Sequence, residues 1–146
     1  MEIQVGEYVS RKDYLKKYDS NVGYALHVQN SIKKDDYARL NTGKIVKVIG
    51  IKENNINKKA IYYGVYKTDW FDSSAVENFS ADIIDLIEIG DYVNGHKIEQ
   101  IWEDAEHYRL AGCNYMFQIT DDEIKSIVTK EQFESMEYKV RRVNKE

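Results

Sequence analysis

The chain has 146 residues and a formal net charge of −4, with 42% hydrophobic and 32% charged residues. These values are ordinary for a soluble globular protein and argue against disorder. No apolar run approaches the roughly 20 residues of a transmembrane helix, and the N-terminus lacks a signal-peptide pattern, so we expect a cytoplasmic protein with no membrane segment. The single cysteine, Cys113, excludes an internal disulfide framework and a multi-cysteine metal cluster.

Two octapeptides, IQVGEYVS at residues 3–10 and IEIGDYVN at residues 87–94, share nearly the same pattern. Each has β-branched and aromatic residues around a glycine, Gly6 or Gly90, which predicts a bent or bulged strand. The repetition indicates two copies of one β-unit, each beginning with this strand. Similar octapeptides also arise without duplication. In that case the chain is still expected to be mostly β, but it would not divide into two units.

Further runs rich in strand-forming residues follow the octapeptides, at residues 42–51, 60–71, 94–103 and 107–119. At the start of the third run, Asn94-Gly95 is a strong signal for a tight turn. The second copy is therefore expected to contain a short hairpin at this point.

The ends of the two copies also match, at residues 75–87 and 127–139, with Val76 aligned to Val128. Each end is expected to form a strand, a single helical turn and a strand. Thr129 and Gln132 have the spacing of a capping box, which supports the turn in the second copy.

Five short strands and one helical turn per copy are typical of a small SH3-like barrel. We therefore predict a mainly β fold with two tandem SH3-like β-barrel units, at residues 1–87 and 88–146.

The copies differ most at residues 11–41, an insert that the second copy lacks. Connections longer than about 12 to 15 residues are usually functional loops or elements of their own. We expect a partly helical insert because Tyr14, Leu15 and Tyr18 have helical spacing and would pack a short amphipathic helix onto the first barrel. The insert carries seven basic and four acidic residues, a balance of +3.

Residues 76–106, by contrast, carry nine acidic residues and one lysine, a balance of −8. Such a stretch repels nucleic acid, complements a basic surface on another protein, or forms an ordinary solvated face. The basic residues of the tail, Lys139, Arg141 and Arg142, either neutralise part of this acidic stretch or contact phosphates.

No motif in the sequence predicts catalysis. His27, His96 and His107 are scattered, without the helical spacing of zinc ligands. There is no phosphate-binding glycine loop and no nucleophile elbow, and His107 with Cys113 is only a weak candidate for a base and nucleophile. We therefore expect a non-enzymatic protein with no metal and no cofactor.

Two segments carry a resemblance to known proteins. ADIIDLIEIGDYVNGHKI at residues 81–98 and IKSIVTKEQFESMEYKV at residues 124–140 resemble short proteins of unassigned function encoded by phages and prophages of low-GC Gram-positive bacteria. Those proteins typically open with V-G-x-Y-[VI], to which Val5 to Val9 correspond, but they lack the insert. The resemblance implies a phage accessory protein in which a β-scaffold shared with those proteins carries a recognition surface that is specific to this chain.

Two functional hypotheses follow. The first is an inhibitor, similar to anti-CRISPR proteins, that binds a host protein such as a bacterial immune effector, because tyrosine and arginine are frequent interface hot spots. Its expected partner-binding residues lie in the insert: Tyr14, Lys16, Lys17, Tyr18, Tyr24, Tyr37 and Arg39. The alternative is an SH3-like module that binds nucleic acid through interleaved tyrosines and lysines. A phage assembly factor or structural protein is a third possibility.

Overall fold

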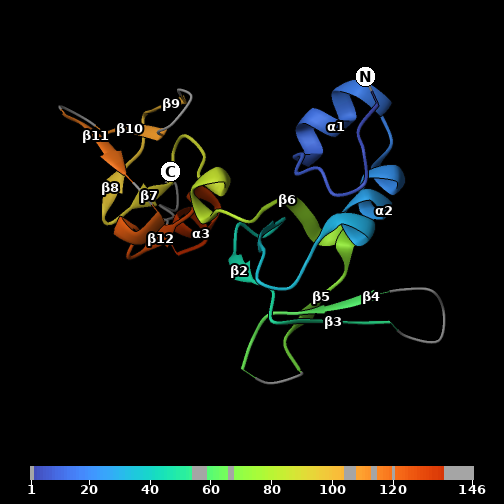
Figure 1. Cartoon of the computed structure of the whole chain (residues 1–146). Coiled ribbons are helices and arrows are strands. Elements are labelled where there is room, and N and C mark those ends of the chain that lie inside the picture. The colour runs from blue at the N-terminus through green and yellow to red at the C-terminus, as the bar shows by residue number, and fades with distance from the viewer. Residues whose placement is uncertain are drawn as a thin grey trace, which may run out of the picture.

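The computed structural model of the chain describes residues 2–53, 59–65, 68–103, 108–112, 115–119 and 121–136. Within these residues the fold is mixed, with small antiparallel sheets of three strands and three α-helices (Figure 1). The helices are α1 (Arg11–Tyr18), α2 (Asn21–Ser31) and α3 (Lys130–Met136). Strands form in all four runs that were expected to contain them.

The first two sheets have the strand orders β2-β1-β6 and β3-β4-β5. Their strands are β1 (Tyr37–Leu40), β2 (Ile45–Lys47), β3 (Gly50–Glu53), β4 (Lys59–Tyr62), β5 (Trp70–Phe71) and β6 (Val76–Ser80). A 3-10 helix, η1 (Ser73–Ala75), precedes β6. We call residues 32–80 the first unit.

The other two sheets, with the orders β12-β7-β8 and β11-β10-β9, repeat this connectivity. Their strands are β7 (Tyr92–Val93), β8 (His96–Lys97), β9 (Gln100–Glu103), β10 (Tyr108–Gly112), β11 (Tyr115–Ile119) and β12 (Ile127–Val128). In both cases a hairpin leads to a three-stranded meander, a 3-10 helix follows, and the last strand returns to pair with the first. In the second case this helix is η3 (Asp121–Glu123). We call residues 87–136 the second unit.

The two units begin with the same turn, at Lys33–Asp36 and Glu88–Asp91. In both turns the backbone N–H of the aspartate donates to the carbonyl oxygen of the first turn residue at 3.1 Å. The aspartate carboxylate in return accepts from the N–H of that first residue, at 2.8 Å in one turn and 2.7 Å in the other. The residue before each aspartate has a positive φ, 74° for Asp35 and 98° for Gly90. The structure therefore supports an internal duplication, with Ile32–Ala38 matching Ile87–Val93.

This match corrects the start of the first copy, which the sequence analysis placed at residues 3–10. That octapeptide forms a similar turn, in which Glu7 N–H donates to the Gln4 carbonyl oxygen at 3.1 Å. No strand follows it, because the next residues pack against α2 instead: the carbonyl oxygen of Glu7 accepts from His27 at 2.8 Å. The predicted strand at residues 3–10 is therefore wrong.

Of the local turn predictions, two are confirmed. Asn94 and Gly95 connect β7 to β8 in a two-residue hairpin loop. Thr129 and Gln132 form the capping box of α3, since each backbone N–H donates to the side chain of the other residue, at 3.1 and 3.3 Å.

The alignment of the unit ends needs a correction of four residues. Ser80 pairs with Tyr37 in the same way that Val128 pairs with Tyr92, so Val128 matches Ser80 and not Val76. A helical turn does follow the last strand of each unit, as expected: η2 (Ile83–Leu86) follows β6 and α3 follows β12.

The predicted insert at residues 11–41 divides into two parts. Its first part forms α1 and α2, which confirms a partly helical segment, and Ser10 and Ser20 cap the N-termini of these helices. Its last residues form β1, the central strand of a sheet. The helices therefore precede the first unit, and we call residues 2–31 the N-terminal extension.

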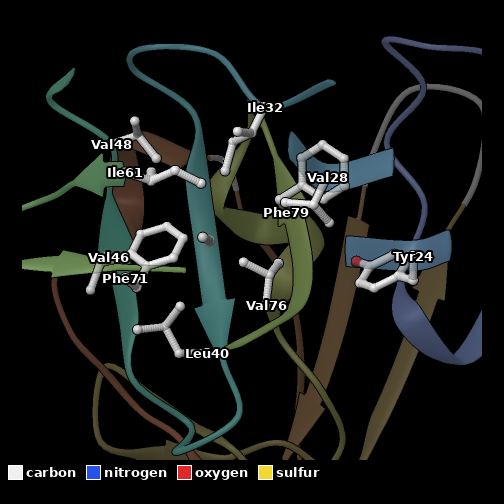
Figure 2. Packing of buried hydrophobic residues seen from close by; sticks show 11 residues of the cluster. Tyr24, Val28, Ile32, Leu40, Val46, Val48, Ile61, Phe71, Val76 and Phe79 are labelled. Carbon is white, nitrogen blue, oxygen red and sulfur yellow. The ribbon is translucent and has the colours of Figure 1, made fainter. Parts of the chain in front are cut away.

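The first unit and the extension share one hydrophobic core (Figure 2). From α2, Tyr24 and Val28 pack against β-strand residues such as Val76 and Phe79. Figure 2 shows these aromatic and branched side chains meeting between the helix and the sheets. Since the helix supplies fully buried side chains, the extension is an integral part of the first fold.

A separate and smaller cluster among the described residues joins Ile84 of η2 to Ile87, Val93 and Ile98 of the second unit. Because Ile84 and Ile87 belong to this cluster, the boundary between the cores lies before residue 88, the predicted start of the second domain. The strand pairings of the described residues form four separate sheets and close no barrel. None of the described helices has the length and apolarity to span a membrane.

Candidate partner-binding surface and the cleft between the units

Arg11, the first residue of α1, fastens the N-terminal extension to the first unit. Its guanidinium donates to the carbonyl oxygens of Ser74 at 2.6 Å and Val76 at 2.9 Å. It also lies 5.0 Å from the ring centre of Tyr24, a cation–π distance. These carbonyl groups belong to the end of η1 and the start of β6, so the helices cover this edge of the sheet.

Two tyrosines complete the attachment. The Tyr24 hydroxyl donates to the carbonyl oxygen of Val9 at 3.0 Å, and the Tyr8 hydroxyl donates to the Asp36 carboxylate at 2.9 Å. Burial and the hydrogen bond to Asp36 raise the pKa of Tyr8 to about 12. Burial also raises the pKa of Tyr24. Both hydroxyls therefore keep their protons at neutral pH.

Two of the predicted partner-binding residues are not on the surface, which corrects their assignment. Tyr24 is 0% exposed because α2 packs it into the core of the first unit. Arg39 is 1% exposed because it points from β1 toward the second unit. Neither side chain is available to a partner in this structure.

The residues on α1 remain accessible. Lys16 and Lys17 are exposed, and Tyr18 is 38% exposed. Tyr14 is partly buried, with its ring centre 4.9 Å from Tyr18 and 5.5 Å from Tyr24. The structure thus brings three of the predicted tyrosines into one cluster, of which Tyr18 is the outermost.

Tyr37 lies apart from this cluster, on β1. It pairs across the sheet with Lys47, whose ammonium nitrogen is 5.8 Å from the Tyr37 ring centre. It is therefore part of the sheet surface of the first unit and not of the helical surface.

The sequence analysis missed two exposed apolar residues on α2. Val22 is 75% exposed and Leu26 is 53% exposed. They are four residues apart and so lie on one face of the helix. This spacing was visible in the sequence, but a helix over residues 21–31 was not expected there. We define Lys16, Lys17, Tyr18, Val22 and Leu26 as the helical surface.

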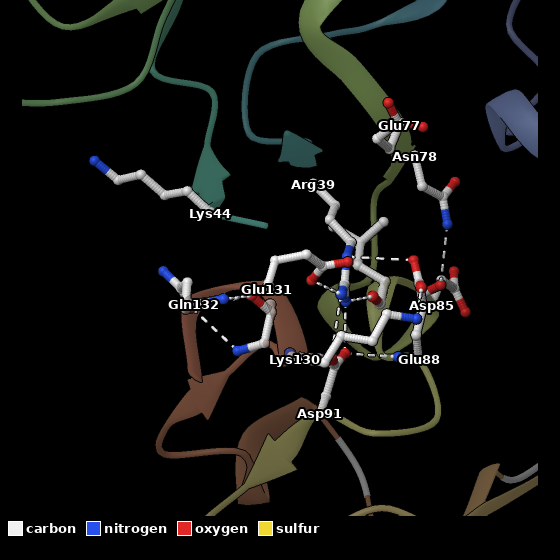
Figure 3. Close-up of polar contacts among 12 residues, drawn as sticks. Arg39, Lys44, Glu77, Asn78, Asp85, Glu88, Asp91, Lys130, Glu131 and Gln132 are labelled. Atoms are coloured by element: carbon white, nitrogen blue, oxygen red, sulfur yellow. Dashed lines mark hydrogen bonds and ion pairs between the residues drawn. The ribbon is translucent and has the colours of Figure 1, made fainter. Parts of the chain in front are cut away.

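Arg39 joins the two units (Figure 3). Its guanidinium donates to both carboxylate oxygens of Asp91, at 2.5 and 3.0 Å, and to the carbonyl oxygen of Leu86 at 2.9 Å. Glu131 accepts from it at 2.7 Å, and Glu88 lies 3.2 Å from its Nε. Asp91 is itself fully buried.

The electrostatics of this cluster favour charged side chains. Burial alone would lower the pKa of Arg39, but the hydrogen bond and charge of Asp91, with the charges of Glu88 and Glu131, raise it. The Lys130 ammonium donates to Glu88 at 2.9 Å, which raises the pKa of Lys130.

A cleft of about 670 Å³ opens beside this cluster, between α1 and the second unit. Lys12, Asp13 and Lys16 line it from α1, while Glu88 and Lys130 line it from the second unit. Its floor includes Glu77, the bulge residue of β6 that has no partner on β1. The mixture of charges suits binding of a polar group.

The two described histidines lie in different environments. His27 is buried and bonded to the Glu7 carbonyl oxygen, whereas His96 is exposed on β8. Within the described part of the chain, no three His, Cys, Asp or Glu side chains are placed to hold a metal ion. His107, Cys113 and the basic tail residues Lys139, Arg141 and Arg142 lie outside the described residues.

No protein-family model, curated protein or solved structure matches the chain.

Proposed function

We propose that this chain is a non-enzymatic protein that binds a partner protein through the helical surface. The observation that carries this proposal is the exposure of Val22 and Leu26 on one face of α2, with Tyr18 at the end of the preceding helix. Exposed apolar residues that lie together, rimmed by polar residues, mark interaction sites, and tyrosine is a frequent anchor. Lys16 and Lys17 supply the charged rim.

The absence of an equivalent pair of helices before the second unit, among the described residues, also supports this proposal. The two units share their turn and their sheet connectivity, so α1 and α2 are not part of the repeated scaffold, although α2 packs into the core of the first unit. An element that is added to only one copy of a duplicated scaffold is a reasonable candidate for the segment that binds a partner.

We further propose that each unit is an SH3-like barrel. In support, each unit has a hairpin, a meander, a 3-10 helix and a strand that pairs back on the first strand, in that order. On this interpretation β2 and β3 are two halves of one strand that bends at Val48 and Ile49 and contributes to both sheets.

Because of the resemblance to phage and prophage proteins, we propose that the partner is a host protein in the bacterial cytoplasm. We place the protein among inhibitors of bacterial immune effectors, similar to anti-CRISPR proteins. Effectors that bind nucleic acid present basic grooves, to which the acidic stretch at residues 76–106 is complementary in charge.

The proposal is tested by capture of host proteins from a lysate of a low-GC Gram-positive bacterium. The variant Val22→Glu/Leu26→Glu puts two charges on the helical surface without touching the core. Val65→Glu is the matched control, because Val65 is 91% exposed and lies in the loop between β4 and β5. We expect a host protein to bind the unmodified chain and Val65→Glu and to be lost with the double variant.

Point variants are preferable to deletion of residues 11–41, because that deletion would remove β1 and the buried Tyr24. Retention of the same host protein by the double variant would contradict the helical surface as the binding site.

Nucleic-acid binding is the second candidate, and one observation favours it. The ammonium groups of Lys44 and Lys47 lie 4.8 and 5.8 Å from the ring centres of Tyr63 and Tyr37, and Trp70 is exposed on the same unit. Such pairs suit base stacking with phosphate contacts. Binding of single-stranded DNA that falls steeply between low and moderate salt would support it, because phosphate contacts release counterions.

A further inference from the structure

We infer that Arg39 is a latch that holds the second unit against the first, and that the two units separate as folded bodies when this latch is released. The guanidinium of one residue on β1 engages three carboxylates, and all three belong to the second unit: Asp91, Glu88 and Glu131. One cationic side chain of the first unit thus inserts among three carboxylates of the second (Figure 3), beside the close approach of Gly43 to Thr129 and Glu131.

The hydrophobic clusters of the two units have no member in common. Separation of the units would consequently leave both described clusters intact. Interfaces between units that are polar and lack a shared core permit relative motion.

The contact beside Arg39 is open to solvent at two places. A surface pocket of about 190 Å³ lies among Ile45 of β2, Ile83 of η2, and Ile124 and Ile127 of the second unit. The cleft of about 670 Å³ opens beside Arg39 and Glu131, which line it. The ion pair of Arg39 with Asp91 is buried between them and is therefore screened little by solvent and salt.

A similar contact, in which a side chain from the preceding segment bonds to the turn aspartate, occurs at the corresponding turn of the first unit. Asp36 matches Asp91 in the duplicated turn, and it accepts the Tyr8 hydroxyl from the N-terminal extension. In both turns the aspartate thus receives a side chain from the segment that precedes its unit. This recurrence indicates that accepting a side chain from the preceding segment is a repeated role of the turn aspartate in this fold.

Opening of the latch would change the cleft, because its two walls belong to different bodies. Lys12 and Lys16 are fixed to the first body by α1, whereas Glu88 and Lys130 belong to the second unit. The state of Arg39 therefore determines the width of this cleft.

The inference is tested by the distance between spin labels at two exposed positions, Lys16→Cys on α1 and Lys97→Cys on β8, with Cys113→Ser as background. Arg39→Met removes the latch charge. Lys47→Met is the matched control, because it removes a positive charge from the neighbouring strand β2, where the side chain is exposed and pairs with Tyr37. Amide hydrogen exchange of the strands in each unit is measured on the same proteins.

For Arg39→Met we expect a longer and broader distance distribution, with the strands of both units still protected from exchange. Arg39→Lys, which keeps the charge but loses the bidentate contact with Asp91, should give an intermediate distribution, and Lys47→Met should leave it unchanged. An unchanged distribution in folded Arg39→Met would overturn the inference. Loss of exchange protection in both units would overturn it as well, because the units would then not be separable bodies.

Discussion

Arg39 carries a positive charge into a site where its side chain is 2% exposed, so the stability of the site depends on the carboxylates around it. Removing one partner of a buried ion pair leaves an uncompensated charge and commonly costs about 3–5 kcal/mol, whereas removing both charges costs much less. This arrangement was not predictable from the sequence, because Asp91 and Glu131 lie 52 and 92 residues further along the chain.

This asymmetry predicts the result of a double-mutant cycle. Arg39→Met should lower the free energy of unfolding by up to about 3–5 kcal/mol, the usual cost of a buried charge without its partner, because separation of the units hydrates Asp91 only by giving up the contact between them. In Arg39→Met/Asp91→Asn the loss should be smaller, because the buried charge is removed. The Glu88 and Lys130 N–H groups donate to different oxygens of Asp91, so the single amide oxygen of asparagine keeps one of these two hydrogen bonds. Urea unfolding of the three proteins measures this; equal losses in the single and double variants would contradict it.

Tyr8 links stability to pH. Its pKa is about 12 in the folded chain, above the ordinary value of 10.0, because the hydroxyl is partly desolvated and bonded to Asp36, although the residue as a whole is 41% exposed. Above pH 10 the unfolded chain loses this proton first, so the Tyr8 contribution to stability is present below pH 10 and is lost as pH rises toward 12.

Tyr8→Phe should therefore give a shallower fall in unfolding free energy over this pH range. Urea unfolding at several alkaline pH values measures the slope. Tyr18→Phe is the control, since the Tyr18 hydroxyl accepts a hydrogen bond from the backbone N–H of Ile3, a contact that involves no carboxylate. The same slope for Tyr8→Phe and the unmodified chain would contradict the role given to Asp36.

Among the elements, the β1–β2 hairpin contacts the start of α3 at Gly43. A Cβ atom at this position would lie 2.6 Å from both the Glu131 Cβ and the Thr129 Oγ1. The φ of Gly43 is also positive, at 87°. The hairpin and the capping box of α3 therefore meet so closely that no side chain fits between them.

Three alanine variants separate these effects. Gly50→Ala should have little effect, since neither a positive φ nor a close neighbour is present at Gly50. Gly95→Ala should cost about 1–2 kcal/mol of unfolding free energy, because φ is 82° but no atom lies within 4 Å of the added Cβ. Gly43→Ala should cost more than Gly95→Ala, because strain and overlap combine. Thermal or urea unfolding measures the loss of stability in each variant. Equal losses for Gly43→Ala and Gly95→Ala would contradict the close contact between the hairpin and α3.

Local signals predicted the elements better than the repeat did. The Asn94-Gly95 turn and the Thr129–Gln132 capping box were predictable because each depends on residues at most three positions apart. The start of the first unit was not, since Lys34 and Asp35 occupy the positions of Ile89 and Gly90. Asp35 adopts the positive φ that glycine usually supplies, which aspartate tolerates at modest cost.

For the whole molecule, the sequence predicted a duplicated, strand-rich chain with a partly helical addition, and the described structure has these features in a mixed fold. It did not predict which faces are exposed. Tyr24 and Arg39 look like interface residues by type, but their burial results from packing between segments distant in sequence. Val22 and Leu26 look like core residues by type, yet α2 turns them outward.

At the scale of the whole molecule, the proposed binding surface and the contact between the two units lie on different segments of the chain. The helical surface lies on the extension, whereas the latch and the duplicated turns lie in the two units. Changes at Val22 and Leu26 should consequently leave the unfolding free energy nearly unchanged, since exposed apolar residues contribute little to the core.

Recognition through the helical surface is best tested by hydrogen exchange of the intact protein, alone and in complex with the host protein that it captures. We expect slower exchange on complex formation at residues 11–31, with smaller changes in the strands of the second unit. Slower exchange confined to β3–β5 or to the second unit, with α1 and α2 unaffected, would contradict the helical surface as the site of recognition.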